Sequence, residues 1–291
     1  MKKSKVNSYL LLERKKNKSN FTEQAIYFFI RTYSAIIEFI FLALNRKYFK
    51  KIIKKKNPLI TIITPTYNRS NILISRAIKS VLNQTYTNFE YIIVGDGCTD
   101  DTEKKINRIK DKRIKFFNIK KKILYKKNLY NLWFVGPVRA LNYGLKKAKG
   151  DWIARIDDDI IWKKNHLEGS LKYCKNNNLE FATSAAYSER FKKRIITRFE
   201  IINKKKVGGS NTFFFISYLK HFEFNLFCWM KKYNRVNDVD FFDRITKLKI
   251  RTGFRNIPSM YNLPRPGETT LGIDQIVLKK KEYEKKYFNK L

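Results

Sequence analysis

Three adjacent aspartates, Asp157, Asp158 and Asp159, are the residues of this sequence best suited to chemistry. They follow the apolar run 152–156, which is typical of a buried strand. Alternate side chains of an extended segment point the same way, so Asp157 and Asp159 can reach one ion while Asp158 faces elsewhere. Ionised carboxylates repel one another at neutral pH, and a hard cation relieves that repulsion. The triplet therefore indicates a Mg²⁺ or Mn²⁺ site, with a solvated acidic turn or a helix cap as the alternative.

Two other polar segments also follow apolar, β-branched runs. One is Thr64-Pro65-Thr66-Tyr67-Asn68-Arg69, and the other is the stretch 95–101, which contains Asp96. Ligands of a parallel sheet bind at the carboxyl ends of its strands. If the three runs are parallel strands, the three polar segments converge on one edge of the sheet.

The elements that must position these segments are alternating strands and helices, which predict an α/β fold with a doubly wound, mostly parallel sheet. The Lys-rich stretch 118–130 is expected to be an irregular loop. The predicted strands cover 59–64, 90–94, 113–117 and 151–156, and the predicted helices cover 72–83, 100–110 and 136–149.

The composition is strongly basic, with 63 Lys and Arg against 25 Asp and Glu and a net charge of +38. Such charge favours an anionic partner, which could be nucleic acid, an acidic membrane surface or a phosphorylated substrate. The three cysteines lack the spacing of a disulfide framework or a zinc site and fit a reducing cytoplasm. Two histidines are too few for a histidine-based metal cluster.

The segment 24–44 has the length of a membrane span, but Arg31 and Glu38 lie seven apart on one face of the predicted helix. A charged pair is costly in hydrocarbon, so the pattern indicates an amphipathic helix. A cluster of lysines and one arginine follows at 46–56, and such clusters bind anionic lipid. We therefore expect a peripheral protein at the inner face of a membrane, with a helix packed on the main domain as the alternative.

The convergent side chains suit a nucleoside diphosphate. Tyr67 offers a ring for a base, Asp96 an acceptor for its N–H groups, Arg69 and Arg139 positive charge, and the aspartate pair a metal for the phosphates. Neither a Walker A pattern nor a G-x-G-x-x-G loop occurs, which argues against kinases and P-loop ATPases. The remaining interpretation is a transferase that consumes an activated sugar.

On these residues the sequence resembles the family 2 glycosyltransferases, which have the GT-A fold. The similar segments are ITPTYNR ending at Arg69, IIVGDGCTDDT at 92–102, GPVRALNYGLKKAKGDWIARIDDD at 136–159 and NDVDFFDR at 237–244. They occur in the family's order over residues 58–265. The resemblance implies flanking regions at 1–57 and 266–291, the first with the amphipathic helix and the second a basic tail with a helix at 275–291.

The resemblance also implies a role for each matching residue in an inverting, metal-dependent enzyme. Asp157 and Asp159 would hold Mn²⁺ or Mg²⁺. Asp238 would be the catalytic base, with Asp240 and Asp243 as alternatives and helix capping as the competing role for all three. The residues implied to bind the nucleotide-sugar are Thr64, Pro65, Thr66, Tyr67, Arg69, Asp96, Arg139, Asp157 and Asp158.

The expected donor is a nucleotide-sugar, with a UDP-sugar favoured, and the expected acceptor is a lipid-linked or cell-surface glycan precursor. Two other functions compete with this hypothesis. A catalytically silent protein of the same fold would tolerate loss of Asp157, Asp159 and Asp238. A basic nucleic-acid-binding protein would use the charge, but no nucleic-acid-binding motif occurs in the sequence, so nucleic acid is not the expected partner.

Overall fold

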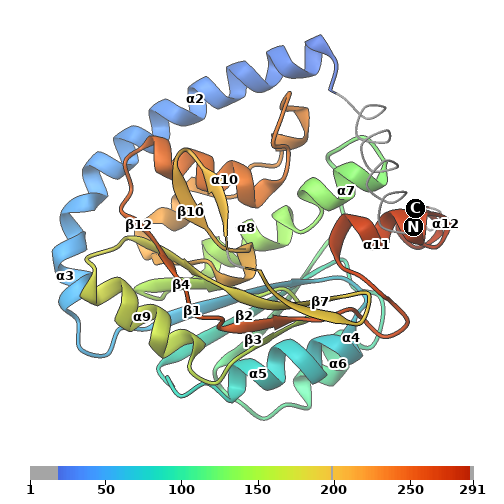
Figure 1. Cartoon of the computed structure of the whole chain (residues 1–291), viewed down its shortest axis with the longest axis horizontal. Coiled ribbons are helices and arrows are strands. Elements are labelled where there is room, and N and C mark those ends of the chain that lie inside the picture. Colours follow the sequence, from blue (N-terminus) through green and yellow to red (C-terminus); the bar gives the residue numbers. More distant parts are fainter. Residues whose placement is uncertain (1–18, 198, 289–291) are drawn as a thin grey trace.

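The computed structural model describes residues 19–197 and 199–288, so the predictions for 1–18 and 289–291 lie outside the described residues. Seven strands of the described chain form a central sheet in the order β12-β6-β11-β4-β1-β2-β3 (Figure 1). All of them run parallel except β11, which is antiparallel to both neighbours. The strands are β1 (Ile60–Thr66), β2 (Phe89–Asp96), β3 (Ile114–Ile119), β4 (Trp152–Arg155), β6 (Phe181–Ser184), β11 (Phe214–Ile216) and β12 (Thr252–Arg255). The predicted α/β fold with a mostly parallel sheet is confirmed.

The middle of this sheet forms the core, because β1, β2 and β4 are buried along their whole length. Ile63 of β1 pairs with Arg155 of β4, so the acidic triplet leaves the sheet beside the polar end of β1. Helix α8 (Val138–Lys147) packs on β1 and β2. Its Gly144 permits this approach, since a Cβ there would lie 2.5 Å from the Ile63 Cγ2 atom.

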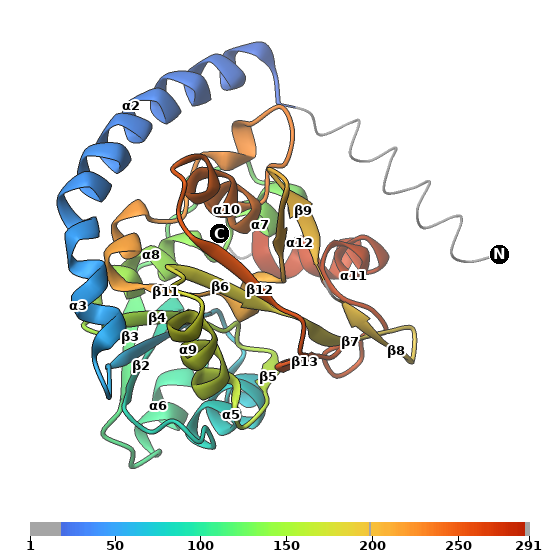
Figure 2. The ribbon, with the colours of Figure 1, turned by 60° about the vertical axis from the view of Figure 1, so that its left-hand side comes forward.

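Helices flank both faces of the sheet, and two smaller sheets extend it (Figures 1 and 2). The first small sheet has the order β5-β13-β7-β8, and β9 pairs with β10 in a hairpin. Its strands are β5 (Ile160–Trp162), β7 (Ala186–Arg190), β8 (Lys193–Thr197) and β13 (Met260–Asn262), and the hairpin joins β9 (Glu200–Ile202) to β10 (Lys205–Val207). Further helices of the domain are α6 (Thr102–Asn107), α9 (His166–Asn176), α10 (Asn237–Lys247), α11 (Gly272–Leu278) and α12 (Lys280–Phe288), and its short 3-10 turns include η3 (Ser210–Thr212), η4 (Ser217–Phe222) and η5 (Cys228–Met230).

Several predicted elements differ in detail from the structure, and the helix predicted over 275–291 is divided in the described residues into α11 and α12. The strand predicted for 59–64 continues to Thr66, and the helix predicted for 72–83 is α4 (Ser70–Ile72), a π-helical segment (Leu73–Ile78) and α5 (Lys79–Leu82). The prediction of an irregular loop over 118–130 is wrong at both ends, because β3 continues to Ile119 and α7 (Leu129–Val135) begins at its C-terminal end. Apolar side chains of α7 pack against α11, which no local pattern reveals.

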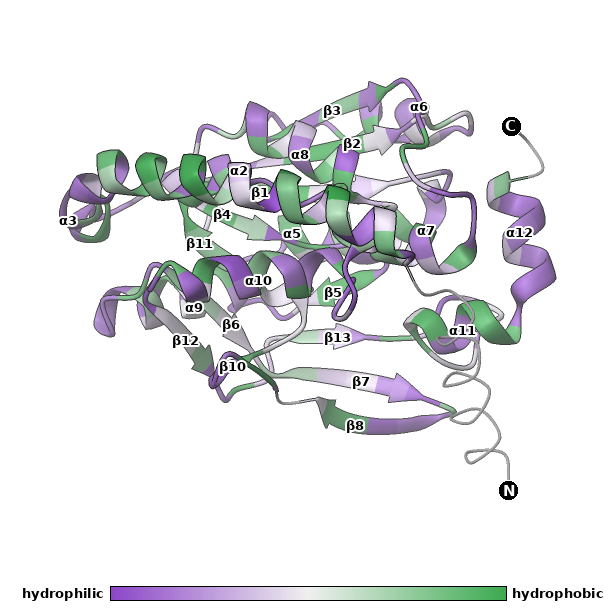
Figure 3. Ribbon diagram, turned by 90° about the horizontal axis from the view of Figure 1, so that it is seen from above, coloured by the Kyte–Doolittle hydropathy of each residue, from purple (hydrophilic) through white to green (hydrophobic). Residues whose placement is uncertain are grey.

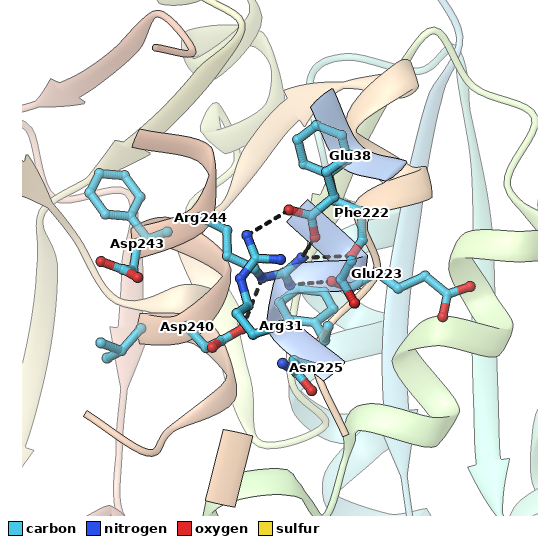
Figure 4. Close-up of polar contacts among 12 residues, drawn as sticks. Arg31, Glu38, Phe222, Glu223, Asn225, Asp240, Asp243 and Arg244 are labelled. Carbon is cyan, nitrogen blue, oxygen red and sulfur yellow. Dashed lines mark hydrogen bonds and ion pairs between the residues drawn. The ribbon is translucent and has the colours of Figure 1, made fainter. Parts of the chain in front are cut away.

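A long N-terminal helix, α2 (Phe21–Asn45), lies along the outside of the domain and leads through η1 (Arg46–Tyr48) into α3 (Phe49–Lys54). Its polar face points inward. Glu38 is buried and forms ion pairs with Arg31 of the same helix and Arg244 of α10 (Figure 4). Figure 3 shows how apolar and polar residues alternate along this helix. The large apolar side chains are exposed while Glu23 and Glu38 are buried, so the predicted amphipathic helix is present with its polar side against the domain.

Candidate active site

A cavity of about 340 Å³ opens at the carboxyl ends of β1, β2 and β4. Side chains from all of the predicted polar segments reach it, although they are far apart in the sequence. The predicted site residues that line it are Pro65, Thr66, Tyr67, Arg69, Asp96, Asp157, Asp158, Asp159 and Asp238. The convergence expected for a parallel sheet therefore occurs at this edge.

Thr64 and Arg139 are the two predicted site residues that are not among the lining residues of this cavity. The Thr64 Oγ1 atom is buried 2.9 Å from the Tyr91 hydroxyl oxygen. The Arg139 guanidinium donates to Asp96 at 3.0 Å and to the Lys120 carbonyl oxygen at 3.0 Å. Thr64 thus belongs to the sheet interior, and Arg139 acts on the cavity through Asp96.

Asp157 and Asp159 face the cavity with protein groups as their present partners. The Asp157 carboxylate accepts hydrogen bonds from Asn211 at 3.0 Å and from Arg155 at 3.3 Å. Asp159 accepts one from Arg265 at 2.7 Å. Their side chains keep 31% and 17% of their surface exposed, so a small ligand can reach both carboxylates.

Asp158 is buried and directed back toward β1. It accepts hydrogen bonds from the Thr66 hydroxyl at 2.8 Å and from Arg69 at 3.1 Å. Desolvation raises the pKa of Asp158, and Arg69 opposes that rise. Burial would also raise the pKa of Asp159, but the nearby Arg265 and Arg69 guanidinium groups lower it below its ordinary value. The site therefore favours the ionised form of Asp159.

The donor set of this acidic pair fits a hard divalent cation. Carboxylate oxygens suit Mg²⁺ and Mn²⁺, and Mg²⁺ is commonly held by one or two carboxylates while water and substrate phosphates complete its shell. Within 19–197 and 199–288, no group of three or more His, Cys, Asp or Glu side chains could hold a metal. Asp157 and Asp159 thus suit an ion that arrives with a phosphorylated ligand.

Asp96 and Tyr67 form the other end of the cavity. The Asp96 carboxylate accepts hydrogen bonds from Lys121 at 2.8 Å and from Arg139 at 3.0 Å. The Lys121 ammonium lies 4.1 Å from the centre of the Tyr67 ring, and the Tyr287 ring is 5.7 Å from it. A planar ligand that stacks on Tyr67 would therefore compete with Lys121, which sequence reasoning did not place in the site.

The C-terminal segment covers this cavity with residues that sequence reasoning did not assign to it. Arg265, Glu268, Tyr283 and Tyr287 all line it. The Tyr287 hydroxyl accepts a hydrogen bond from Arg69 at 2.7 Å, and the Tyr283 hydroxyl donates one to Glu268 at 2.8 Å. The two tyrosines are four residues apart on α12, and this helical spacing is the one sequence signal that they share a face.

Helix α10 carries three aspartates in different environments. Asp238 is partly exposed and lines the cavity. Asp240 is buried in an ion pair with Arg244, and Asp243 pairs with Lys247 at 2.8 Å. Among the three candidates for the catalytic base, Asp238 is the one that reaches the cavity.

A second cavity of about 740 Å³ meets the first at Asp238, Val236 and Trp133. Its walls are mainly aromatic and aliphatic, and Lys232 and Arg235 also line it. The aromatic lining residues are Tyr130, Trp133, Phe134, Phe199, Phe213, Tyr233 and Phe242. Asp238 therefore stands between a polar cavity with an acidic pair and an apolar cavity with basic groups.

Known proteins resemble this chain over the same region. It is 34% identical over 151 residues to an Escherichia coli protein named UDP-Glc:alpha-D-GlcNAc-diphosphoundecaprenol beta-1,3-glucosyltransferase WfgD. The aligned region covers 52% of this chain and 49% of that protein. It is 42% identical over 124 residues to an uncharacterized glycosyltransferase of Rickettsia bellii, and this aligned region covers 42% of this chain and 16% of that protein. The chain thus spans about half or less of the length of these relatives.

Solved structures share the fold at low sequence identity. S. aureus TarS in complex with UDP aligns with a TM-score of 0.52 and 18% identity, over 71% of this chain and 61% of that chain. The mannosyltransferase PcManGT from Pyrobaculum calidifontis aligns with a TM-score of 0.50 and 15% identity, over 79% of this chain and 67% of that chain. The predicted GT-A fold is confirmed. The family model described as Glycosyl transferase family 2 matches residues 61–236. This chain therefore belongs to the family 2 glycosyltransferases.

Proposed function

We propose that the protein is a metal-dependent, inverting glycosyltransferase that moves a sugar from a nucleoside diphosphate to a hydroxyl acceptor. The observation that carries the proposal is that Tyr67, Asp96, the pair Asp157 and Asp159, and Asp238 all line one cavity. These groups match the base, the phosphates and the reacting hydroxyl of such a reaction.

The donor would lie along the cavity with its base at Tyr67 and Asp96. Ring stacking on Tyr67 would displace the Lys121 ammonium, and the Asp96 carboxylate would accept hydrogen bonds from the base. At the other end, Asp157 and Asp159 would hold Mn²⁺ or Mg²⁺, which when bound neutralises the charge that develops on the leaving diphosphate.

Asp238 would act as the base. An acceptor hydroxyl is a weak nucleophile, and a carboxylate within hydrogen-bond distance takes its proton as the oxygen bonds to the anomeric carbon. The carbon-oxygen bond to the diphosphate breaks in the same displacement. One displacement from the face opposite the leaving group inverts the anomeric configuration.

The acceptor would enter through the second cavity. Its aromatic wall suits sugar rings and an apolar chain, and Lys232 and Arg235 beside it suit a diphosphate. The E. coli relative described above is named for a UDP-glucose donor and an undecaprenol-diphosphate acceptor. We therefore favour a UDP-sugar as donor and a lipid-linked glycan precursor as acceptor.

We place this reaction at the cytoplasmic face of a membrane. All three cysteines, Cys98, Cys174 and Cys228, are free thiols in the structure, which suits a reducing compartment. A lipid-linked acceptor confines the reaction to a membrane surface.

The test is nucleotide release from a panel of UDP-, GDP-, dTDP- and CMP-sugars with Mn²⁺, Mg²⁺ or EDTA, with a polyprenyl-diphosphate sugar as acceptor. We expect metal-dependent release from one donor. Asp238→Asn should lower turnover by roughly 10²- to 10⁴-fold while donor affinity stays unchanged, because the base acts on the acceptor.

The matched control is Asp243→Asn, which alters an aspartate of the same helix that pairs with Lys247 outside the cavity. It should retain full turnover. If no donor in the panel binds or reacts, the protein is a catalytically silent member of its family. If Asp238→Asn and Asp243→Asn are equally active, Asp238 is not the base.

A further inference from the structure

The outer face of α2 is an unusual surface for a helix that is packed on a domain. Buried positions on this helix include the charged residues Glu23 and Glu38, while large apolar side chains face outward. Contiguous apolar surface of this kind marks an interaction site. The apolar residues of α2 that are more than half exposed are Phe21, Phe28, Phe29, Tyr33, Ile36, Phe39, Ile40 and Leu44.

Ion pairs and a hydrogen bond join the inner face of α2 to α10. Arg244 forms ion pairs with Glu38 and Asp240 (Figure 4). The Tyr27 hydroxyl donates a 2.7 Å hydrogen bond to Asp240. Arg31 adds a 2.9 Å ion pair to Glu38. These bonds hold the helix on the domain and fix which face it presents outward.

This attachment decides between crossing a membrane and lying on it. By length and composition the helical stretch Phe21–Lys54 could cross a membrane. Crossing would pull Glu38 and Arg31 away from Arg244 and place both charges in hydrocarbon, where ionisable groups are costly. Lying in the interface keeps every ion pair and still removes the apolar face from water.

Exposed positive charge follows α2 along the chain. η1, α3 and the residues after them carry exposed lysines, and within 19–197 and 199–288 only one of these forms an ion pair, Lys55 with Asp151. Clustered lysines beside an amphipathic helix are attracted to anionic headgroups. The exposed lysines are Lys47, Lys50, Lys51, Lys54, Lys55 and Lys56.

We propose that α2 lies in the plane of an anionic lipid bilayer, with its apolar face in the headgroup boundary and the lysines of α3 on the headgroups. The N-terminal end of α2 also adjoins the loop 232–236 that lines the second cavity, because the hydroxyl of Ser19, two residues before the helix, donates to the carbonyl oxygen of Lys231, directly before that loop, at 3.0 Å. Tyr233 of that loop is 70% exposed. The bilayer would thus meet the entrance for a lipid-linked acceptor, a step that rests on the proposed function.

The test is co-flotation of the full chain with vesicles of phosphatidylcholine alone or mixed equally with phosphatidylglycerol. We expect binding to the anionic vesicles. Phe29→Ser with Phe39→Ser should weaken it about tenfold or more, because both side chains face outward. Lys50→Glu with Lys54→Glu should weaken binding to the anionic vesicles and leave binding to the phosphatidylcholine vesicles unchanged. Ile257→Ser, which changes an exposed apolar residue outside α2, should bind as the unaltered protein does.

A depth measurement separates an in-plane helix from a spanning one. Phe29→Trp and Ile40→Trp place a fluorophore on one face of α2, eleven residues or about 16 Å apart along the helix. Brominated lipids should quench both tryptophans from the same shallow depth. Clearly different depths would overturn the in-plane arrangement.

Two other results would overturn the proposal. One is equal flotation of the chain and its Phe29→Ser, Phe39→Ser variant. The other is a dimer in sedimentation that this variant abolishes while no vesicle binds, which would assign the face to a second copy of the chain. Neither readout needs turnover, so failure of membrane binding and failure of the glycosyl transfer are distinguishable.

Discussion

Two clusters of arginine and carboxylate groups show opposite designs in this protein. In the cavity at the end of the sheet, Arg265 pairs with Asp159, whose side chain is 17% exposed. At the junction of α2 and α10, Arg244 pairs with Glu38 and Asp240, whose side chains are 6% and 1% exposed. The first cluster faces a space that a ligand can fill, and the second is sealed.

The two clusters differ in whether a charged side chain can exchange its ion-pair partner for a ligand or water. In the sealed cluster the charges cannot exchange a partner for solvent, so loss of Arg244 leaves Glu38 with its ion pair to Arg31 alone and Asp240 with its ion pair to Lys231 alone. A charge at a cavity can take a cation, a phosphate or water instead. We therefore expect the sealed cluster to determine stability and the open cluster to determine binding and turnover.

The largest effect is expected from Arg244→Met. It removes the guanidinium that Glu38 and Asp240 share and leaves them only Arg31 and Lys231 as ion-pair partners, so it should lower the free energy of unfolding by about 3 kcal/mol, the low end of the cost of breaking a buried ion pair. Urea unfolding measures the change, with Lys247→Met on the same helix as an exposed control that should change stability by under about 1 kcal/mol. Equal stability of the two variants would refute the contrast between sealed and open pairs.

Asp159→Asn is expected to have the reverse profile. Turnover should fall by on the order of 10²- to 10³-fold, about 3–4 kcal/mol in the barrier, because the acidic pair loses one charge toward the proposed Mn²⁺ or Mg²⁺. The unfolding midpoint should change little, since the side chain is partly exposed. Asp111→Asn, far from the cavity, is the control for turnover. A stability loss as large as that of Arg244→Met would show that both clusters are structural.

A smaller, pH-dependent effect is expected from His166, a buried ring that forms no ion pair in the described parts of the chain. It stacks on Trp162, and burial lowers its pKa to about 3. The unfolded chain takes up a proton below about pH 6.5 while the folded chain does not, so stability is lost as the pH falls from about 6.5 toward 3.

Between pH 7 and pH 5 this difference should cost about 2 kcal/mol of unfolding free energy. His166→Gln should remove most of that pH dependence, as urea unfolding at the two pH values measures. His221→Gln, at an exposed position, should remove less. An unchanged slope in His166→Gln would mean that the folded protein accepts the proton at that ring.

The sequence predicted the parts of the site that depend on local pattern. Apolar runs that end in polar residues located the ends of β1, β2 and β4, and parallel connection rules then brought Tyr67, Asp96 and Asp157 to one edge. The position of Asp238 came from the family resemblance alone. Its neighbours Asp240 and Asp243 have the same residue type, and only the packing of α10 separates the three.

The parts that the sequence did not predict depend on long-range packing. Arg265 and Tyr287 reach the cavity because the C-terminal segment folds back across the sheet edge, and Lys121 reaches Tyr67 from an irregular loop. The amphipathic pattern of α2 was evident. That its polar face points inward could not be predicted, because this orientation depends on the ion pair between Glu38 and Arg244, which are remote in the sequence.

The Arg76 guanidinium limits which part of the C-terminal segment over the cavity can move. Arg76, from the π-helical segment, donates to the carbonyl oxygens of Asp159 at 3.0 Å, Leu263 at 2.8 Å and Pro264 at 2.6 Å. The chain is therefore anchored up to Pro264, the Arg265 side chain adds its ion pair with Asp159, and the first position beyond them with a positive φ is Gly267, at 77°. If the proposed nucleotide binds beneath α12, rotation at Gly267 is the movement that would release it, and product release would then be a gated step separate in time from bond formation.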